Sequence, residues 1–197
     1  MKKTGIFFLM VGFTGNAFEQ PIFKSEQPTN EIISTQQYSS NWIDNFRAFR
    51  TAVYQADKTK VKSFIDFPIM NENNEIWYLV NPENENLSDK IKPFTEKDFD
   101  QYFGKLFTKE FKDCIQKIKT QELYNTGYFE TIEFHNGKET AYKMYATVDK
   151  KERSLTLNLA FKTMIKDSND AGESNILYYF KIEQNEALKF IQVRLAG

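Results

Sequence analysis

The chain has 197 residues, with 26 basic and 27 acidic side chains, one histidine and one cysteine. The near balance of charge argues against a nucleic-acid partner, because such proteins normally carry a broad positive field. Its 19 Phe and 10 Tyr can fill a real core, which argues against a disordered chain. A single cysteine excludes a disulfide within the chain, so its stability must come from packing.

The first 17 residues have the layout of a secretory signal peptide. Lys2 and Lys3 precede an apolar run over residues 6–13, and small residues follow at Gly15 and Ala17. That run is well short of the roughly 20 residues that a membrane span needs; a buried N-terminal strand is the alternative interpretation. We expect an exported protein, periplasmic or secreted, without a stable membrane anchor after cleavage.

Residues 18–39 carry two prolines and many polar side chains without a hydrophobic period, which predicts a flexible leader. Residues 40–197 are then expected to form one α+β domain. It opens with two amphipathic helices that meet near Asp57 and end before Pro68, where the residue preceding proline leaves the helical region. Ser39 or Ser40 can cap the first helix. The predicted core residues of this corner are Trp42, Phe46, Phe49, Val53, Val61, Phe64, Ile65 and Phe67.

The next segments combine a strand, a loop and a helical block. Ile76 to Val80 is rich in β-branched and aromatic residues and predicts a short strand. Residues 81–93 have loop composition and are longer than most connections, so they are either functional or an inert insertion. Thr95 and Asp98 then predict a capping box for a helix that Thr108 interrupts and caps again.

Beyond Leu123 the hydrophobic period becomes alternating, which predicts an antiparallel meander. Asn136 and Gly137 are a strong hairpin signal between the first two of its strands. The inward sets that the alternation predicts are Tyr128, Ile132 and Phe134; Tyr142, Met144, Ala146 and Val148; Leu155, Leu157, Leu159 and Phe161; Ile176, Tyr178, Phe180 and Ile182; and Ile191, Val193 and Leu195.

Most residues with catalytic or metal-binding chemistry have a plain structural interpretation. His135 precedes the hairpin turn and is expected at the surface, while Cys114 shares the apolar side of its helix and is expected to be buried. One His and one Cys exclude the usual zinc sites. The acidic loop at 167–174 fails the EF-hand spacing, because Ala171 occupies a ligand position. We expect no metal and no cofactor.

One group of residues supports a ligand site. Arginines of the first helix and tyrosines of the strands could line a cavity between the helices and a curved sheet. A solvated helix face and ordinary strand aromatics are the structural alternative. The candidate ligand-binding residues are Arg47, Arg50, Tyr142, Tyr145, Tyr178 and Tyr179, and Arg153 belongs to the same group that could line the cavity.

The order of these elements resembles the cystatin-like α+β cone of the NTF2-like superfamily. FRAFRTAVYQADKTKVKSFIDFP at residues 46–68 and FDQYFGKLF at 99–107 look like small uncharacterised exported bacterial proteins of that type. The resemblance covers residues 40–195. It implies helices packed on a curved antiparallel sheet of about five strands, with a pocket at the open end of the cone.

Some NTF2-like relatives are isomerases, cyclases or dehydratases that use Asp and His in that pocket, and others are binding or dimerisation modules. Because this chain offers no histidine suited to such a role, we favour a non-catalytic exported protein that binds an unknown small ligand or protein, with a homodimer through the sheet as an option. One alternative is an NTF2-like enzyme with Asp44 or Asp66 as carboxylate base. The other is a periplasmic inhibitor or immunity-type protein acting through residues 81–93 or a hairpin tip.

Overall fold

The computed structural model describes residues 41–83, 90–137, 139–164 and 171–197, all within one compact unit that spans 38–197. The predicted signal peptide, the whole predicted leader and the first half of the acidic loop at 167–174 lie outside these residues. None of the described helices is both long enough and apolar enough to span a membrane. The predicted α+β class is confirmed, with helices in the first part of the domain and an antiparallel sheet in the second.

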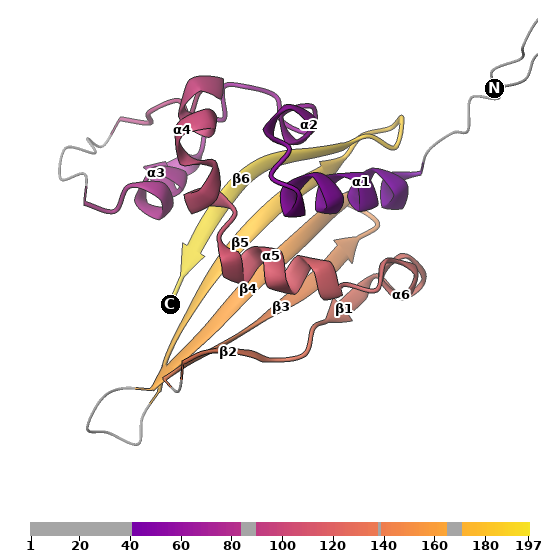
Figure 1. Cartoon of the computed structure of the whole chain (residues 1–197). Coiled ribbons are helices and arrows are strands. Elements are labelled where there is room, and N and C mark those ends of the chain that lie inside the picture. Colours follow the sequence, from indigo (N-terminus) through magenta and orange to yellow (C-terminus); the bar gives the residue numbers. More distant parts are fainter. Residues whose placement is uncertain (1–40, 84–89, 138, 165–170) are drawn as a thin grey trace, which may run out of the picture. The chain divides into compact units, whose positions relative to one another are not determined.

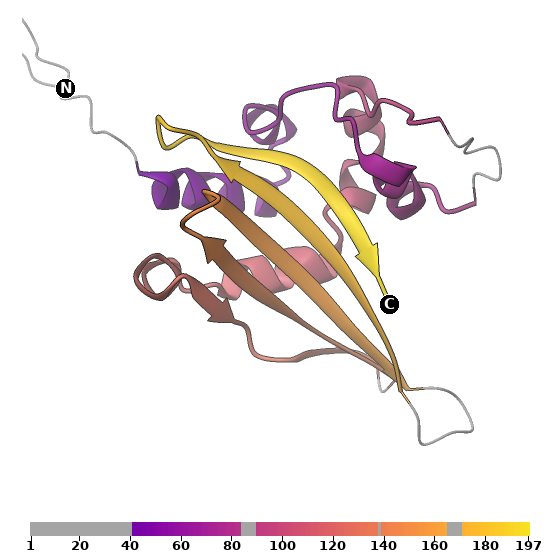
Figure 2. The same ribbon diagram turned by 180° about the vertical axis from the view of Figure 1, so that it is seen from behind.

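The helices precede the strands along the chain and cover one face of the sheet (Figure 1). The opposite face has no helix in front of it when the domain is seen from behind (Figure 2). The helices are α1 (Trp42–Tyr54), α2 (Lys58–Lys62), the 3₁₀ turn η1 (Glu72–Asn74), α3 (Glu75–Val80), α4 (Glu96–Leu106), α5 (Lys109–Lys117) and α6 (Thr120–Thr126).

The sheet is open, and its neighbouring strands run antiparallel in the order β1-β3-β4-β5-β6, with β2 also paired to β3. It is built mainly from three long strands that follow one another in the chain, as the alternating pattern predicted. The strands are β1 (Tyr128–Glu130), β2 (Phe134–Asn136), β3 (Thr140–Asp149), β4 (Ser154–Met164), β5 (Ala171–Ile182) and β6 (Leu188–Ala196).

The predicted helical corner forms the centre of the core. Phe49 is completely buried, and its ring meets those of Phe64, Phe107 and Phe180 edge to face at 5.0–5.8 Å between centroids. Trp42 and Phe67 pack against this core but keep part of their surface exposed. Within the described residues the side chain that caps α1 is that of Asn41, which accepts from the backbone N–H of Asp44.

Local capping signals were predicted correctly at three other helix starts. Asp57 caps α2, Thr108 caps α5, and Thr95 and Asp98 form the predicted capping box at the start of α4. The predicted inward sets of β3, β4 and β5 also face the helices, with Met144, Leu157 and the other central members fully buried.

The predicted strand at Ile76 to Val80 is wrong, because these residues form helix α3. Ile76, Trp77 and Val80 are buried on one helical face that packs against β6 and α4. The indole N–H of Trp77 donates to the carbonyl oxygen of Lys92, 2.9 Å away. A five-residue apolar run has no period of its own, so its tertiary contacts decide between helix and strand.

Two inward sets were predicted only in part, because Phe134 packs against the core and Val193 is fully buried, as predicted, but other members are exposed. In β1 the buried residue is Phe129, while Tyr128 and Ile132 are exposed. In β6 the ladder with β5 shifts at a bulge, because Phe180 faces Phe190 whereas Tyr179 faces Gln192, which leaves Ile191 unpaired. Ile191 therefore points outward, and the inward set of β6 is Leu188, Phe190 and Val193; Leu195 is also exposed.

Strand β6 is an edge of the sheet, and the loops after α2 hold it. The backbone N–H of Phe190 donates to the carbonyl oxygen of Phe64 at 2.8 Å. The backbone N–H of Val193 donates to Oδ1 of Asn71 at 2.7 Å, and Asn71 is itself buried. These bonds give the edge backbone partners from another part of the same domain.

Candidate functional site

The structure does not bring the six predicted ligand-binding residues into one cavity. Tyr142 and Tyr178 face the helices, whereas Tyr145 and Tyr179 project from the opposite face of the sheet. The hydroxyl of Tyr178 donates to the carbonyl oxygen of Leu106 in full burial. The hydroxyl of Tyr142 donates to Asp113 at 2.9 Å. Ligand binding by these tyrosines stays a prediction.

Arg47 and Arg50 fasten α1 to the segment between α5 and α6. Nε of Arg47 donates to the hydroxyl of Thr120 at 2.9 Å, and Nη1 of Arg50 donates to the carbonyl oxygen of Ile118 at 2.7 Å. Burial lowers the pKa of Arg50, and the neighbouring Arg47 cation acts in the same direction. Both arginines lie off the buried stripe of α1, as predicted, and their contacts are structural.

The carboxylates considered as catalytic bases are exposed and paired. Asp44 lies in the first turn of α1 and forms an ion pair with Arg47. Asp66 pairs with Lys189 at 2.7 Å, and 76% of its side chain is accessible. Neither carboxylate lines a cavity found among the described residues. A general base with a raised pKa needs an enclosed site, which neither aspartate has.

His135 and Cys114 lie where the sequence predicted. His135 is in β2 with 63% of its side chain exposed, and its nearest acid is Glu133 at 3.5 Å. Cys114 is fully buried, and burial raises the pKa of its thiol to about 12. No group of three or more His, Cys, Asp or Glu side chains in the described part of the chain could hold a metal ion.

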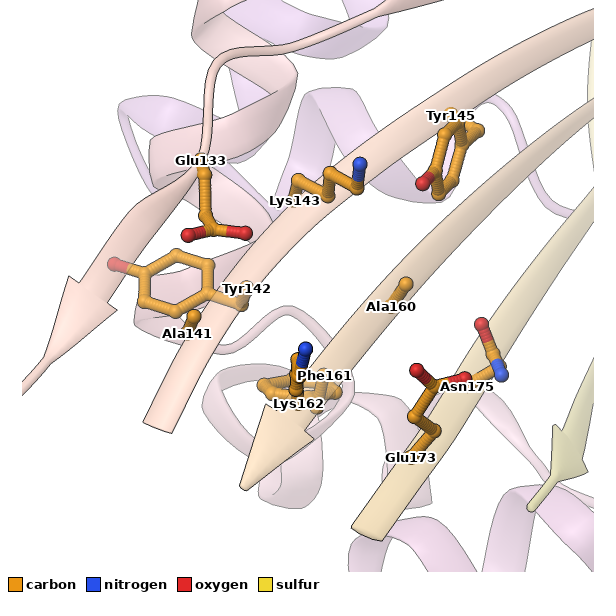
Figure 3. A pocket seen from close by; sticks show the side chains of 10 residues that line it. All are labelled: Glu133, Ala141, Tyr142, Lys143, Tyr145, Ala160, Phe161, Lys162, Glu173 and Asn175. Carbon is orange, nitrogen blue, oxygen red and sulfur yellow. The ribbon is translucent and has the colours of Figure 1, made fainter. Parts of the chain in front are cut away.

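A shallow hollow of about 320 Å³ lies mainly on the uncovered face of the sheet (Figure 3). Ala141 on β3 and Ala160 on β4 leave room there, and charged side chains stand around them. Lys143 is already paired with Glu130 at 2.7 Å. Ligand pockets are mostly apolar with a few polar groups, so this polar hollow is a poor candidate. Its lining is Glu133, Ala141, Tyr142, Lys143, Tyr145, Ala160, Phe161, Lys162, Glu173 and Asn175.

A larger cavity of about 500 Å³ lies where the start of α1, α6, the β3–β4 turn and the β5–β6 turn meet. These elements gather at the right-hand side of the domain in Figure 1. We call this cavity the Trp42 cleft. Its lining residues are Trp42, Tyr124, Asn125, Val148, Asp149, Lys150, Arg153, Ile182 and Glu186.

The Trp42 cleft is lined by two aromatic side chains and two aliphatic ones. The rings of Trp42 and Tyr124 lie 5.9 Å apart between centroids, inclined at 32°. Val148 near the end of β3 and Ile182 at the end of β5 are aliphatic residues of the inward face that line the same cavity. Exposed aromatic faces beside aliphatic side chains can bind a flat, apolar ring by stacking and burial.

An ion pair forms the polar side of the cleft. Nη2 of Arg153 lies 2.7 Å from Oε1 of Glu186 and also donates to the carbonyl oxygen of Glu183. Nε of Arg153 donates to the carbonyl oxygen of Ile182 at 3.1 Å. The other carboxylate oxygen of Glu186 accepts the backbone N–H of Trp42 at 3.3 Å. The two turns are thus tied to one another and to α1.

Both residues of this pair have an unusual backbone conformation, and Glu186 also has a shifted pKa. Arg153 and Glu186 adopt left-handed φ values of 48° and 67°, although neither is glycine. Such conformations cost energy and occur often at functional sites, where the surrounding structure maintains them. The hydrogen bond from Arg153 holds the pKa of Glu186 below its ordinary value, and the N–H of Trp42 adds to this, while burial acts in the opposite direction.

The comparisons with known proteins add little to this geometry. No protein-family model matches the chain, and no curated protein matches its sequence. Among solved structures, the chain is similar to a protein from Shewanella frigidimarina that is provisionally assigned as a ketosteroid isomerase. The match covers 81% of this chain and 98% of that one, with 8% sequence identity and a TM-score of 0.31.

Proposed function

We propose that the protein is an exported, non-catalytic binding protein of the NTF2-like type that holds a small ring-bearing ligand in the Trp42 cleft. The observation that carries this proposal is the contact between the rings of Trp42 and Tyr124 in a cavity of about 500 Å³ that Val148 and Ile182 also line. That volume lies within the roughly 300–1,000 Å³ typical of small-molecule sites.

The charges of the cleft favour binding over catalysis. Glu186 is held in its ionised form by Arg153, so it is a poor acid or base near neutral pH. Asp44 and Asp66 are exposed and paired elsewhere. The enzyme alternative would therefore need a base outside the residues considered for it.

The neutral fluorescent probe N-phenyl-1-naphthylamine tests the binding function. Trp42 lies in the cleft, whereas Trp77 is only 2% exposed and packs on Phe94, so energy transfer to the probe can be assigned with a Trp42→Phe variant. We expect saturable binding that weakens about tenfold or more in Tyr124→Ala, because base-type stacking on an aromatic ring contributes ~1–3 kcal/mol. Tyr78→Ala, on exposed α3 surface, is the matched control.

An absence of saturable binding to the wild-type protein would overturn the proposed function. So would equal weakening by Tyr124→Ala and Tyr78→Ala, provided that thermal melts show both variants folded. The export part of the proposal has its own test. Expressed from its first residue in a Gram-negative host, the chain should appear outside the cytoplasm with a mass that lacks about the first 17 residues.

A further inference from the structure

The two acids of the Trp42 cleft both accept hydrogen bonds from the protein's own donors. Oδ1 of Asp149 accepts the backbone N–H groups of Lys151 and Glu152, at 2.8 and 2.9 Å, and so shapes the β3–β4 turn. Glu186 uses one oxygen for Arg153 and the other for the N–H of Trp42. Glu186 therefore has both carboxylate oxygens paired, whereas Asp149 keeps Oδ2 without a partner among the described residues.

The donors of the same cleft are largely unused. Within the described part of the chain, the ammonium of Lys150, the indole N–H of Trp42 and the hydroxyl of Tyr124 have no hydrogen bond or ion pair. Nε and Nη2 of Arg153 donate to Ile182, Glu183 and Glu186, which leaves Nη1 without a partner in the described part of the chain. Oδ1 of Asn125 accepts from Gln121, so its amide N–H groups are also available.

This imbalance has a chemical consequence. The cleft has no net charge by side-chain count, yet apart from Oδ2 of Asp149 the unpartnered polar groups named here are donors, and two of them belong to cations. A ligand that brings an acceptor or a negative charge gains charge-assisted hydrogen bonds without breaking an internal bond. Among the described carboxylates of the cleft, a cationic ligand has only Oδ2 of Asp149 to bind unless it displaces Arg153 from Glu186.

We infer that the ligand of the Trp42 cleft is a ring-bearing organic anion, whose ring lies on Trp42 and Tyr124 and whose carboxylate meets Lys150 and the free edge of Arg153. The inference rests on the proposed function and adds the class of ligand to it. Trp42 and Tyr124 belong to the helices, and Lys150 and Arg153 belong to the β3–β4 turn. An aromatic carboxylate can therefore place its ring against the helices and its charged group against the turn.

Three small compounds with the same ring test the inference: phenylacetate, neutral 2-phenylethanol and cationic 2-phenylethylamine. Each is measured by displacement of N-phenyl-1-naphthylamine at low salt and neutral pH. We expect phenylacetate to bind about tenfold more tightly than 2-phenylethanol, and the amine to bind most weakly. Added salt should reduce the preference for the anion, because the charges are accessible to solvent.

Two variants in one turn locate the effect. Lys150→Gln should remove most of the preference for phenylacetate, whereas Lys151→Gln makes the same change of charge at an exposed residue that does not line the cleft. Equal effects of the two variants, equal affinity for the three compounds, or no displacement by any of them would overturn the ligand class and leave the proposed function intact. No binding of the naphthylamine at all would overturn both.

Discussion

The hydroxyl of Tyr178 in β5 donates a 2.9 Å hydrogen bond to the carbonyl oxygen of Leu106, the last residue of α4. The final carbonyl groups of a helix have no partner within it, and this one lies in the core, away from water. Tyr178 thus joins the helical layer to the middle of the sheet. A residue that the sequence suggested for ligand binding has a structural role.

We predict that Tyr178→Phe destabilises the domain by about 1–3 kcal/mol, because it leaves a buried carbonyl group without its partner. Urea unfolding followed by circular dichroism measures the change. Tyr179→Phe is the matched control, since its ring lies on the uncovered face of the sheet. Identical unfolding midpoints for the two variants would contradict the role given to this bond.

Phe49→Ala is expected to cost about 3–5 kcal/mol, the usual range for truncation of a buried Phe. Its ring is fully buried among three other phenylalanine rings from three other parts of the chain. Tyr54→Ala, in the same helix but 61% exposed, should change stability by much less. A thermal melt of the Phe49 variant close to that of wild type would refute the assignment of the core.

The ion pair between Arg153 and Glu186 predicts a dependence of stability on acid. The folded-state pKa of Glu186 lies below its unfolded-state value, so its ionised form stabilises the protein above the ordinary glutamate pKa. That contribution is lost as the pH falls through the folded-state pKa. Thermal melts of wild type and Glu186→Gln should differ near neutral pH and converge in acid; a constant difference would show that ionisation of Glu186 is not involved.

Cys114 should be unreactive in the folded protein. Burial raises the pKa of its thiol to about 12, so almost none of the nucleophilic thiolate is present near neutral pH. Iodoacetamide should modify the native protein at a small fraction of the rate seen in urea, as followed by mass spectrometry. Rapid modification of the native state would mean that α5 opens away from the sheet.

The sequence predicts the sheet best where its strands are long and follow one another. In β3, β4 and β5 a strict alternation over about ten residues determines which side chains face inward. Short segments carry too little pattern for this. Ile76 to Val80 has the composition of a strand, yet it forms a helix because one helical face packs Trp77 against α4 and β6.

Val193 of β6 was predicted to face inward, but Leu188 and Phe190 were missed, because the unpaired Ile191 at the bulge shifts the alternation between the two parts of the strand. The Trp42 cleft was missed for a related reason. Its residues come from four separated segments, and Tyr124 and Trp42, which belong to α6 and α1, meet only in the folded domain. The one signal in the sequence was Arg153, a lone arginine in a tight turn between two apolar strands.

The loops that contact β6 limit the pairing of this edge strand with a strand of another chain. An unprotected edge strand invites a strand from another chain, but here Phe190 and Val193 already donate to Phe64 and Asn71. These two N–H groups of β6 are therefore not available to pair with an added strand. The homodimer through the sheet that the sequence suggests stays a prediction, and the face available to it is the uncovered one that carries Tyr145 and Tyr179.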